Sequence, residues 1–305
     1  MNGRTSVERA KGWEKWWRLF RPFTLTAAVM PVLIGFFLAF AEGYRRWDLF
    51  AAMMIASILI QGATNMFNEY FDYKRGLDSP DSVGIAGAIV RDGIPEQTVF
   101  RLGCMLYFFS LLIGVYICWQ SSWWVAVVGL LSMAVGYFYT GGPVPLAYTP
   151  FGELVVSIFM GPIIVLLAYY IQTGSLNLQV VVASVPIALL VASLLLANNI
   201  RDLDKDREKG RKTLPILFGR RRAIGVLAVL FALTYVWTVI NVLTEVFPLW
   251  VLLALLSIPT AIRVILSFRG KRKALEMMPA MKATAQLHAQ YGLLFTAGWF
   301  FGSLL

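Results

Sequence analysis

The sequence is short of charge. Only 14% of its 305 residues are charged, whereas a soluble domain carries about 25%. Hydrophobic residues make up 58% of the chain, and apolar runs of about 20 residues recur throughout it. Such runs are typical of transmembrane helices, so the composition excludes an ordinary soluble domain.

The sequence is also poor in the side chains that bind zinc or form disulfides. It has one histidine, His288, and two cysteines, Cys104 and Cys118. If one helix holds both cysteines, roughly 21 Å separates them, which is too far for a disulfide. One histidine and two distant thiols exclude a zinc site, so we expect His288 to be structural. The N-terminus lacks the apolar core of a signal peptide.

We predict an all-α fold, a polytopic membrane protein with about nine transmembrane helices in a bundle. The helices are expected at residues 22–41, 48–68, 97–118, 122–140, 151–171, 179–199, 221–242, 247–268 and 284–304. Residues 22–305 would form a single transmembrane domain. Residues 1–21 are expected to form a cytoplasmic amphipathic segment, because Trp13, Trp16 and Trp17 fall on one helical face. The alternative is a short basic flank of the first span.

The basic residues are unevenly distributed among the predicted loops. The chain has 27 Lys and Arg against 17 Asp and Glu, which gives a net charge of +10. All the basic residues except Arg45, Arg46 and Arg263 fall in the N-terminal segment, in alternate loops or at the span ends beside these loops. The positive-inside rule therefore predicts a cell-membrane protein whose N-terminus and active site face the cytoplasm. The same bias explains the net charge, so we expect no nucleic acid partner, and no protein partner is required.

Two acidic stretches end the second and sixth predicted spans. In each stretch an asparagine is followed four residues later by an aspartate, so the two side chains share one face of a helix. Carboxylates beside a bilayer are costly and usually functional. The stretches contain six candidate oxygen ligands: Asn68, Asp72, Asp78, Asn198, Asp202 and Asp206.

These ligand types favour magnesium. Mg²⁺ prefers oxygen ligands and usually takes one or two carboxylates together with phosphate oxygens of a substrate. Two separated acidic ladders therefore predict a Mg²⁺-diphosphate site with these six residues as metal ligands. Basic side chains lie nearby and are candidate diphosphate ligands: Lys74, Arg75, Arg91, Arg201, Arg207, Lys209 and Lys212. The alternative is that both stretches belong to solvated inner loops.

Both motifs resemble those of the UbiA superfamily of intramembrane prenyltransferases, and they are most similar to its MenA type. The first motif reads Asn68-Glu69-x2-Asp72-x5-Asp78, and the second reads Asn198-Asn199-x-Arg201-Asp202-x3-Asp206. The ubiquinone branch usually has an aspartate where this chain has Gly76, and the ending Arg75-Gly76-Leu77-Asp78 resembles the MenA type instead. Glu69 stands where the family usually has aspartate.

The resemblance implies transfer of a polyprenyl group from polyprenyl diphosphate to 1,4-dihydroxy-2-naphthoate, with decarboxylation, to give demethylmenaquinone. It implies Mg²⁺ as cofactor and a cytoplasmic cap formed by the loops after helices 2 and 6. The catalytic residues implied are Asn68, Asp72, Asp78, Asp202, Asp206 and Tyr139. Another acceptor, such as 4-hydroxybenzoate or homogentisate, is one alternative. A transporter of an anionic substrate is another, although transporter sites tend to lie near the bilayer midplane.

Overall fold

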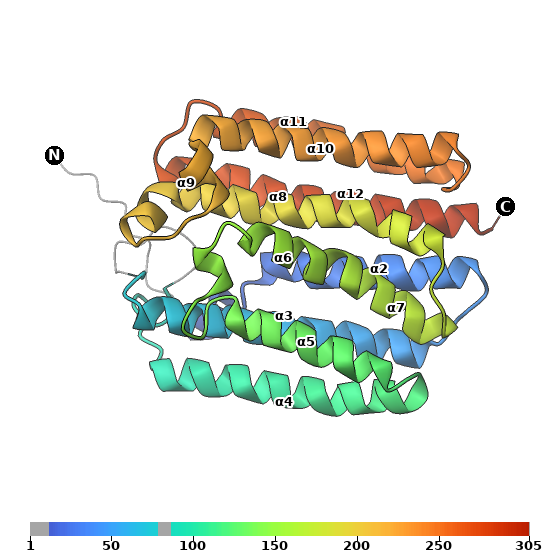
Figure 1. Cartoon of the computed structure of the whole chain (residues 1–305), viewed down its shortest axis with the longest axis horizontal. Helices are drawn as coiled ribbons and strands as arrows, with labels where there is room; N and C mark the ends of the chain where they lie inside the picture. Colours follow the sequence, from blue (N-terminus) through green and yellow to red (C-terminus); the bar gives the residue numbers. More distant parts are fainter. Residues whose placement is uncertain (1–11, 79–86, 305) are drawn as a thin grey trace.

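The computed structural model describes residues 12–78 and 87–304, which form a bundle of long, roughly antiparallel helices (Figure 1). These residues contain no strand, which confirms the predicted all-α fold. The bundle consists of α2 (Thr26–Ala41), α3 (Trp47–Lys74), α4 (Glu96–Gln120), α5 (Trp124–Phe138), α6 (Gly152–Ile158) continued by η3 (Phe159–Ile163) and α7 (Ile164–Thr173), α8 (Leu178–Glu208), α10 (Arg220–Leu243), η4 (Leu249–Ser257) continued by α11 (Ile258–Phe268), and α12 (Met278–Gly302).

The predicted spans all correspond to helical segments of the described chain. Seven segments are long and apolar enough to cross a membrane. Of the other two, α5 is apolar but has only 15 residues. Helix α12 is long enough, with 25 residues, but is not among the seven. The chain is therefore a multi-pass membrane protein, and the expected count of about nine includes these two less typical helices.

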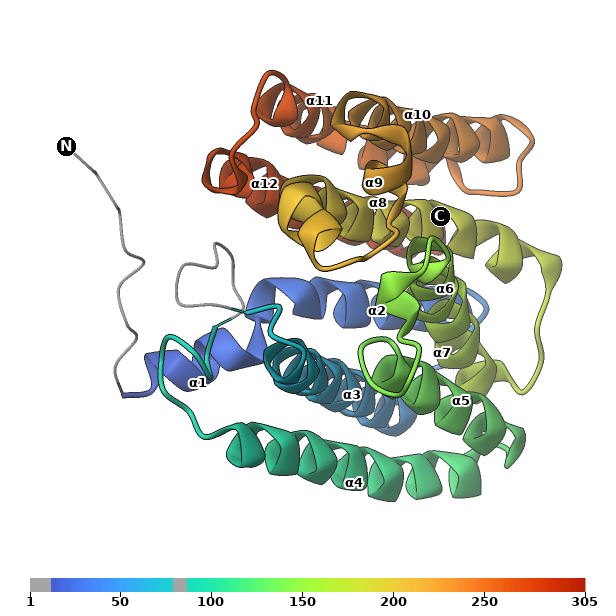
Figure 2. The ribbon, with the colours of Figure 1, turned by 60° about the vertical axis from the view of Figure 1, so that its left-hand side comes forward.

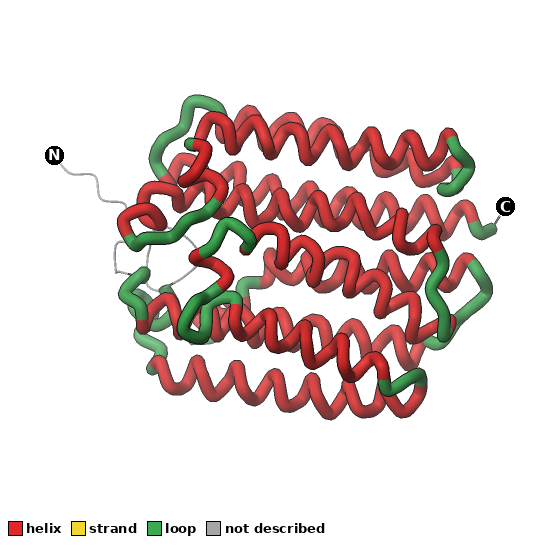
Figure 3. Tube along the Cα trace, viewed as in Figure 1, coloured by secondary structure: helices red, strands yellow, loops and turns green. Residues whose placement is uncertain are grey.

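Short helices lie in the connections, mainly at one end of the bundle (Figures 1 and 3). They are α1 (Glu14–Phe20), η1 (Pro22–Leu25), η2 (Leu146–Tyr148), α9 (Leu214–Phe218) and η5 (Ala274–Met277). The two long connections, after α3 and after α8, lie at this same end (Figure 1). The connections at the other end are shorter, so the extra chain length is concentrated on one side.

Helices α3 and α8 extend beyond the apolar runs that predict them. The predicted spans end at residues 68 and 199, whereas the helices continue to Lys74 and Glu208. The polar residues that follow each apolar run are compatible with a helix, and neither run meets a helix breaker until Gly76 or Gly210. Both glycines have positive φ, at 65° and 77°, as expected for residues just beyond a helix end. Both acidic motifs therefore lie on or beside the last turns of a helix.

Two of the segments are not regular α-helix throughout. Between α6 and α7, η3 is a π-helical turn that contains Pro162, a residue that cannot donate a backbone hydrogen bond. The segment η4 is a 3₁₀-helix of nine residues, and Pro259 lies in the first turn of α11, which follows it. Each irregularity lies beside a proline that disfavours a continuous ladder of α-helical hydrogen bonds.

The helices pack through large apolar side chains and through glycines at close approaches. The core between α2, α7, α8, α10 and α12 buries Tyr169, Tyr291 and Phe295. His288 on α12 is also fully buried, in agreement with a structural position. At Gly35, an added Cβ would lie 2.4 Å from the Val165 carbonyl oxygen of α7. Small residues at such positions allow membrane helices to pack closely.

Gly35→Ala tests this packing. The new methyl group would meet the backbone of α7, so we expect a loss of about 1–3 kcal/mol in stability. The matched control is Gly225→Ala on α10, where an added Cβ meets no atom within 4 Å. Thermal unfolding in detergent should give a lower midpoint for Gly35→Ala and an unchanged or higher one for the control. Equal midpoints for both variants would contradict the close approach.

Candidate active site

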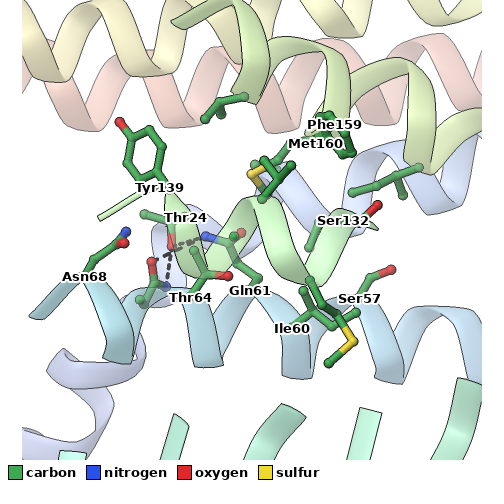
Figure 4. A pocket seen from close by; sticks show the side chains of 18 of the residues that line it. Thr24, Ser57, Ile60, Gln61, Thr64, Asn68, Ser132, Tyr139, Phe159 and Met160 are labelled. Atoms are coloured by element: carbon green, nitrogen blue, oxygen red, sulfur yellow. Dashed lines mark hydrogen bonds between the residues drawn. The ribbon is translucent and has the colours of Figure 1, made fainter. Parts of the chain in front are cut away.

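A large cavity runs along the inside of the bundle, with a volume of about 590 Å³. Helices α3, α4, α5 and α8 contribute most of its wall, together with η1 and η3. One end contains the two acidic motifs, and the rest is mainly apolar, with residues such as Ile60, Phe159 and Met160 (Figure 4). We call the charged end the mouth of the cavity.

The mouth brings together most of the residues predicted from the two motifs. Eight predicted site residues line the cavity: Asn68, Asp72, Asp78, Tyr139, Asn198, Arg201, Asp202 and Asp206. Figure 4 shows Asn68 and Tyr139 at the same end of it. Residues more than 100 positions apart in the sequence therefore share one site, because α3 and α8 end on the same side of the bundle.

Ion pairs connect the two motifs directly. The Lys205 ammonium lies 3.1 Å from Oδ1 of Asp78. The Arg211 guanidinium lies 2.9 Å from Oδ1 of Asp72 and 3.3 Å from Oδ1 of Asp206. The pairs at Asp78 and Asp72 join the first motif to the second motif and to the loop that follows it. The Arg211–Asp206 pair joins this loop to the second motif. Basic residues of this chain therefore lie between the facing carboxylates.

Arg211 is the main site residue that the predicted set omits. Its side chain is 14% exposed, and it also lies over the Tyr148 ring, 5.2 Å from the centroid. Burial by itself lowers the pKa of Arg211, but the carboxylates of Asp72 and Asp206 more than compensate, so its pKa is raised. Arg211 is therefore charged throughout the physiological pH range. It lies between Lys209 and Lys212 in sequence, and no pattern distinguishes it from them.

The aspartates of the second motif have different environments. Asp202 accepts two hydrogen bonds from its neighbour Arg201, at 2.8 and 2.6 Å. Asp206 is 4% exposed. Asp204, between them, is 65% exposed and pairs with Arg220, outside the cavity. The helical periodicity thus directs Asp202 and Asp206 towards the cavity and Asp204 away from it.

Two buried carboxylate oxygens at the mouth have no hydrogen-bond partner: Oδ2 of Asp78 and Oδ2 of Asp206. A buried acceptor without a partner is costly, and a cation would stabilise it. No three acidic, histidine or cysteine side chains of the described chain are grouped closely enough to hold a metal by themselves. The donor set therefore fits an ion that takes one or two carboxylates and completes its shell with other oxygens, as Mg²⁺ does.

The other predicted diphosphate ligands do not line the cavity. Lys74 pairs with Glu96 at 2.6 Å. Arg75 donates to the carbonyl oxygens of Thr140 and Gly142, and Arg91 lies against Gly87. The remaining three, which are exposed, are Arg207, Lys209 and Lys212.

Glu69 of the first motif does not line the cavity either. It is 1% exposed, and its carboxylate lies 2.9 Å from the Arg21 guanidinium. It also accepts backbone N–H groups of Gly87 and Ile89. Glu69 therefore connects α3 to the segment before α2 and to the connection that follows α3. Arg21 lines the cavity and, like Lys205 and Arg211, is missing from the predicted set.

The loop after α8 covers the mouth, as the predicted cap requires. It carries Arg211, and its Lys212 N–H donates to the Tyr148 carbonyl oxygen at 3.1 Å. The connection between α5 and α6, which contains Tyr148, is therefore a third part of the cap that the motifs do not reveal. Residues 79–86 of the connection after α3 lie outside the described residues.

Glu153, in the first turn of α6, contacts the second motif and the start of α9. It is 5% exposed and accepts a hydrogen bond from Nδ2 of Asn199 at 2.7 Å. It also accepts the backbone N–H of Leu214 at 3.3 Å. These contacts join α6, α8 and α9, so Glu153 holds the second motif in position.

Comparison with known proteins agrees with this geometry. The family model described as "UbiA prenyltransferase family" matches residues 28–301. A Bacillus subtilis (strain 168) protein named 1,4-dihydroxy-2-naphthoate octaprenyltransferase is 46% identical over 298 residues, which cover 97% of this chain and 95% of the relative. A human protein named UbiA prenyltransferase domain-containing protein 1 is 31% identical over 287 residues, covering 91% and 81%.

Solved structures share the fold. A UbiA homologue from Archaeoglobus fulgidus, bound to GPP and Mg²⁺, superposes with a TM-score of 0.63 at 17% identity, covering 95% of this chain and all of the other. A homologue from Aeropyrum pernix K1 gives a TM-score of 0.64 at 17% identity, covering 89% and 96%. With the family match over most of its length, this chain belongs to the UbiA prenyltransferase family.

Proposed function

We propose that this protein transfers a polyprenyl group from polyprenyl diphosphate to 1,4-dihydroxy-2-naphthoate, with loss of the ring carboxylate. The observation that carries the proposal is the 46% identity, over nearly the whole chain, to the Bacillus subtilis naphthoate prenyltransferase. A charged mouth that continues into an apolar cavity suits a substrate with a diphosphate head and an isoprenoid tail. Membership of a prenyltransferase family favours transfer of this substrate over transport of an anion.

The residues that would hold Mg²⁺ are the carboxylates of the mouth, Asp72 and Asp78 from the first motif and Asp202 and Asp206 from the second. Asn68 and Asn198 supply neutral oxygens beside them. The unpartnered oxygens of Asp78 and Asp206 support this assignment. When bound, Mg²⁺ neutralises negative charge on the diphosphate and makes it a better leaving group.

The chain's own residues stabilise the departing diphosphate and protect the reaction from water. Arg201, Lys205 and Arg211 place three positive charges at the mouth. The C–O bond between the first prenyl carbon and the diphosphate breaks, and a C–C bond forms at the ring carbon that releases CO₂. The product is the reduced form of demethylmenaquinone. The apolar wall excludes water that would otherwise capture the allylic cation, and Tyr139 lies beside the reacting end.

We propose that the mouth faces the cytoplasm and that residues 22–305 form one domain after an amphipathic segment, residues 1–21, at the inner membrane surface. In the described part of that segment, α1 is short, and Trp13 and Trp17 are 73% and 49% exposed. The basic connections lie at the end of the bundle that contains the mouth (Figure 1). The positive-inside rule supports this orientation.

The purified protein should form prenylated product from labelled polyprenyl diphosphate and 1,4-dihydroxy-2-naphthoate. Chelation of divalent cations should abolish turnover, and added Mg²⁺ should restore it, because the mouth supplies carboxylates for the ion. Parallel reactions with 4-hydroxybenzoate, homogentisate and no acceptor define specificity. Failure to prenylate any of these acceptors would exclude the proposed activity, and preference for another acceptor would exclude the naphthoate.

Asp206→Asn should lower kcat by at least about 100-fold, because it removes a charge from the buried centre of the mouth. Asp204→Asn is the matched control, since it makes the same chemical change two residues away on the exposed side of α8. Its kcat should stay within about twofold of the parent protein. Similar losses in both variants would show that the cavity face of α8 is not the reacting face.

The orientation can be measured with single cysteines in a Cys104→Ser, Cys118→Ser background. Lys209→Cys lies beside the mouth, and Ser175→Cys lies in the connection at the other end of the bundle. In intact cells, a membrane-impermeant maleimide should label Ser175→Cys at once and Lys209→Cys only after permeabilisation. The reverse pattern would place the mouth outside the cell.

A further inference from the structure

One patch of the cavity wall beyond the mouth is polar, although most of the wall around it is apolar. It is formed by Thr24 of η1 with Gln61 and Asn65 of α3, and all three side chains line the cavity. Gln61 is 7% exposed and Asn65 is 3% exposed. Figure 4 shows Thr24 and Gln61 next to the end of the cavity that contains Asn68 and Tyr139. A buried amide is costly in such a place unless its donors and its acceptor are all paired.

Hydrogen bonds fix the orientation of both amides in this patch. Nδ2 of Asn65 donates to the Phe20 carbonyl oxygen at 3.0 Å and to Oγ1 of Thr24 at 2.9 Å. Because a carbonyl oxygen can only accept, the opposite side of the Asn65 amide, Oδ1, is turned towards Gln61. This oxygen accepts a hydrogen bond from Nε2 of Gln61 at 3.3 Å. Nε2 also donates to Oγ1 of Thr24 at 3.4 Å, so the NH₂ group of Gln61 is fully directed at the wall.

The carboxamide oxygen of Gln61, Oε1, is left without a donor among the described residues. The Thr24 hydroxyl is not available to it, because it donates to the Arg21 carbonyl oxygen at 2.9 Å. Other hydroxyls that line the cavity, those of Ser110 and Ser132, donate to carbonyl oxygens of their own helices. Oε1 of Gln61 is therefore a hydrogen-bond acceptor that the cavity offers to a ligand.

Gln61 lies at the depth that an aromatic acceptor would reach. It precedes Asn68 by seven residues, so the two side chains share one face of α3 and are roughly 10 Å apart along the helix. The diphosphate and the first prenyl carbon would occupy the mouth. A two-ring aromatic acid that meets this carbon lies just inside the mouth and extends towards Gln61.

The two hydroxyls of 1,4-dihydroxy-2-naphthoate differ in what they need from the protein. The hydroxyl next to the carboxylate forms an internal hydrogen bond to that carboxylate. The carboxylate itself favours the cations of the mouth, among them Arg21. The second hydroxyl lies across the ring from the first, and it needs an acceptor inside an apolar cavity.

We propose that Gln61 binds the aromatic acceptor, and that its Oε1 accepts a hydrogen bond from this second hydroxyl. The inference rests on the proposed function and places the acceptor against the α3 wall of the cavity. It also makes Gln61 a specificity-determining residue. An aromatic acid without the second hydroxyl would leave a buried oxygen unpaired, and sites built to bind a hydroxyl reject ligands that lack it.

Gln61→Met tests this contact, because methionine has a similar length and no oxygen. Calorimetry on the full chain in detergent would give Kd values for 1,4-dihydroxy-2-naphthoate and for 1-hydroxy-2-naphthoate, which lacks the second hydroxyl. Mg²⁺ and inorganic diphosphate are present in place of the donor, and oxygen is excluded. The parent protein should bind the dihydroxy acid at least about tenfold more tightly. In Gln61→Met this preference should disappear, while the Kd of the monohydroxy acid stays within about twofold of the parent value.

Gln172→Met is the matched control. Gln172 of α7 is also 7% exposed, and its amide is paired with the backbone of Arg46, but it does not line the cavity. This variant should keep the preference of the parent protein. Thermal unfolding of both variants establishes that they are folded.

The outcomes separate this inference from the proposed function. A preference that persists in Gln61→Met, or an equal loss of both acids, would show that Gln61 only supports the wall and would overturn its assignment to the acceptor. Equal binding of the two acids by the parent protein would overturn it as well. Each of these results leaves the proposed function intact if the parent protein still prenylates the dihydroxy acid. Absence of prenylated product from the parent protein would instead reject the proposed function.

Discussion

The structure depends on the balance of charge at the mouth of the cavity. Carboxylates from two distant motifs face one another at the end of an otherwise apolar bundle, and such a group repels itself unless cations separate its members. Arg211 supplies this separation by contacting Asp72 on α3 and Asp206 on α8, and Lys205 adds a second connection through Asp78. These cations therefore hold the carboxylates of the two motifs close together at the mouth.

This arrangement also explains why the loops at the mouth are long. A short turn after α8 would not return Arg211 to the cavity. The loop reaches back over the helix end, and Tyr148 from the connection between α5 and α6 lies beneath the Arg211 guanidinium. The Lys212 N–H also donates to the Tyr148 carbonyl oxygen, which holds the loop over the mouth. The loop thereby places one charged side chain, Arg211, between two helices.

The predictable part of the site follows from periodicity. Asn68 and Asp72, like Asp202 and Asp206, are four residues apart on helices, and this spacing alone directs them to one face. It also separates Asp204 from the cavity. The helix ends were less predictable, since hydropathy detects where apolar residues stop and not where the backbone ceases to be helical. Gly76 and Gly210 mark those ends better than the first charged residue does.

The sequence does not show which basic residues contact the site and which are exposed, because residues in loops have no fixed period that directs them to one face. Arg211 and Lys212 are adjacent and chemically similar, yet Arg211 lies in the mouth and Lys212 is exposed. Arg75 belongs to a motif and yet donates to carbonyl oxygens of another connection. These positions depend on which segments meet in space.

The nine-residue 3₁₀-helix η4 has a consequence for the surrounding bilayer. A 3₁₀-helix rises about 2.0 Å per residue, against about 1.5 Å in an α-helix, so this stretch is roughly 4–5 Å longer than nine α-helical residues. The segment from Leu249 to Phe268 has only 20 residues. At the same tilt, the extra rise lets it span a thicker hydrocarbon layer than 20 α-helical residues would. Hydrophobic mismatch on this side of the protein is thereby reduced.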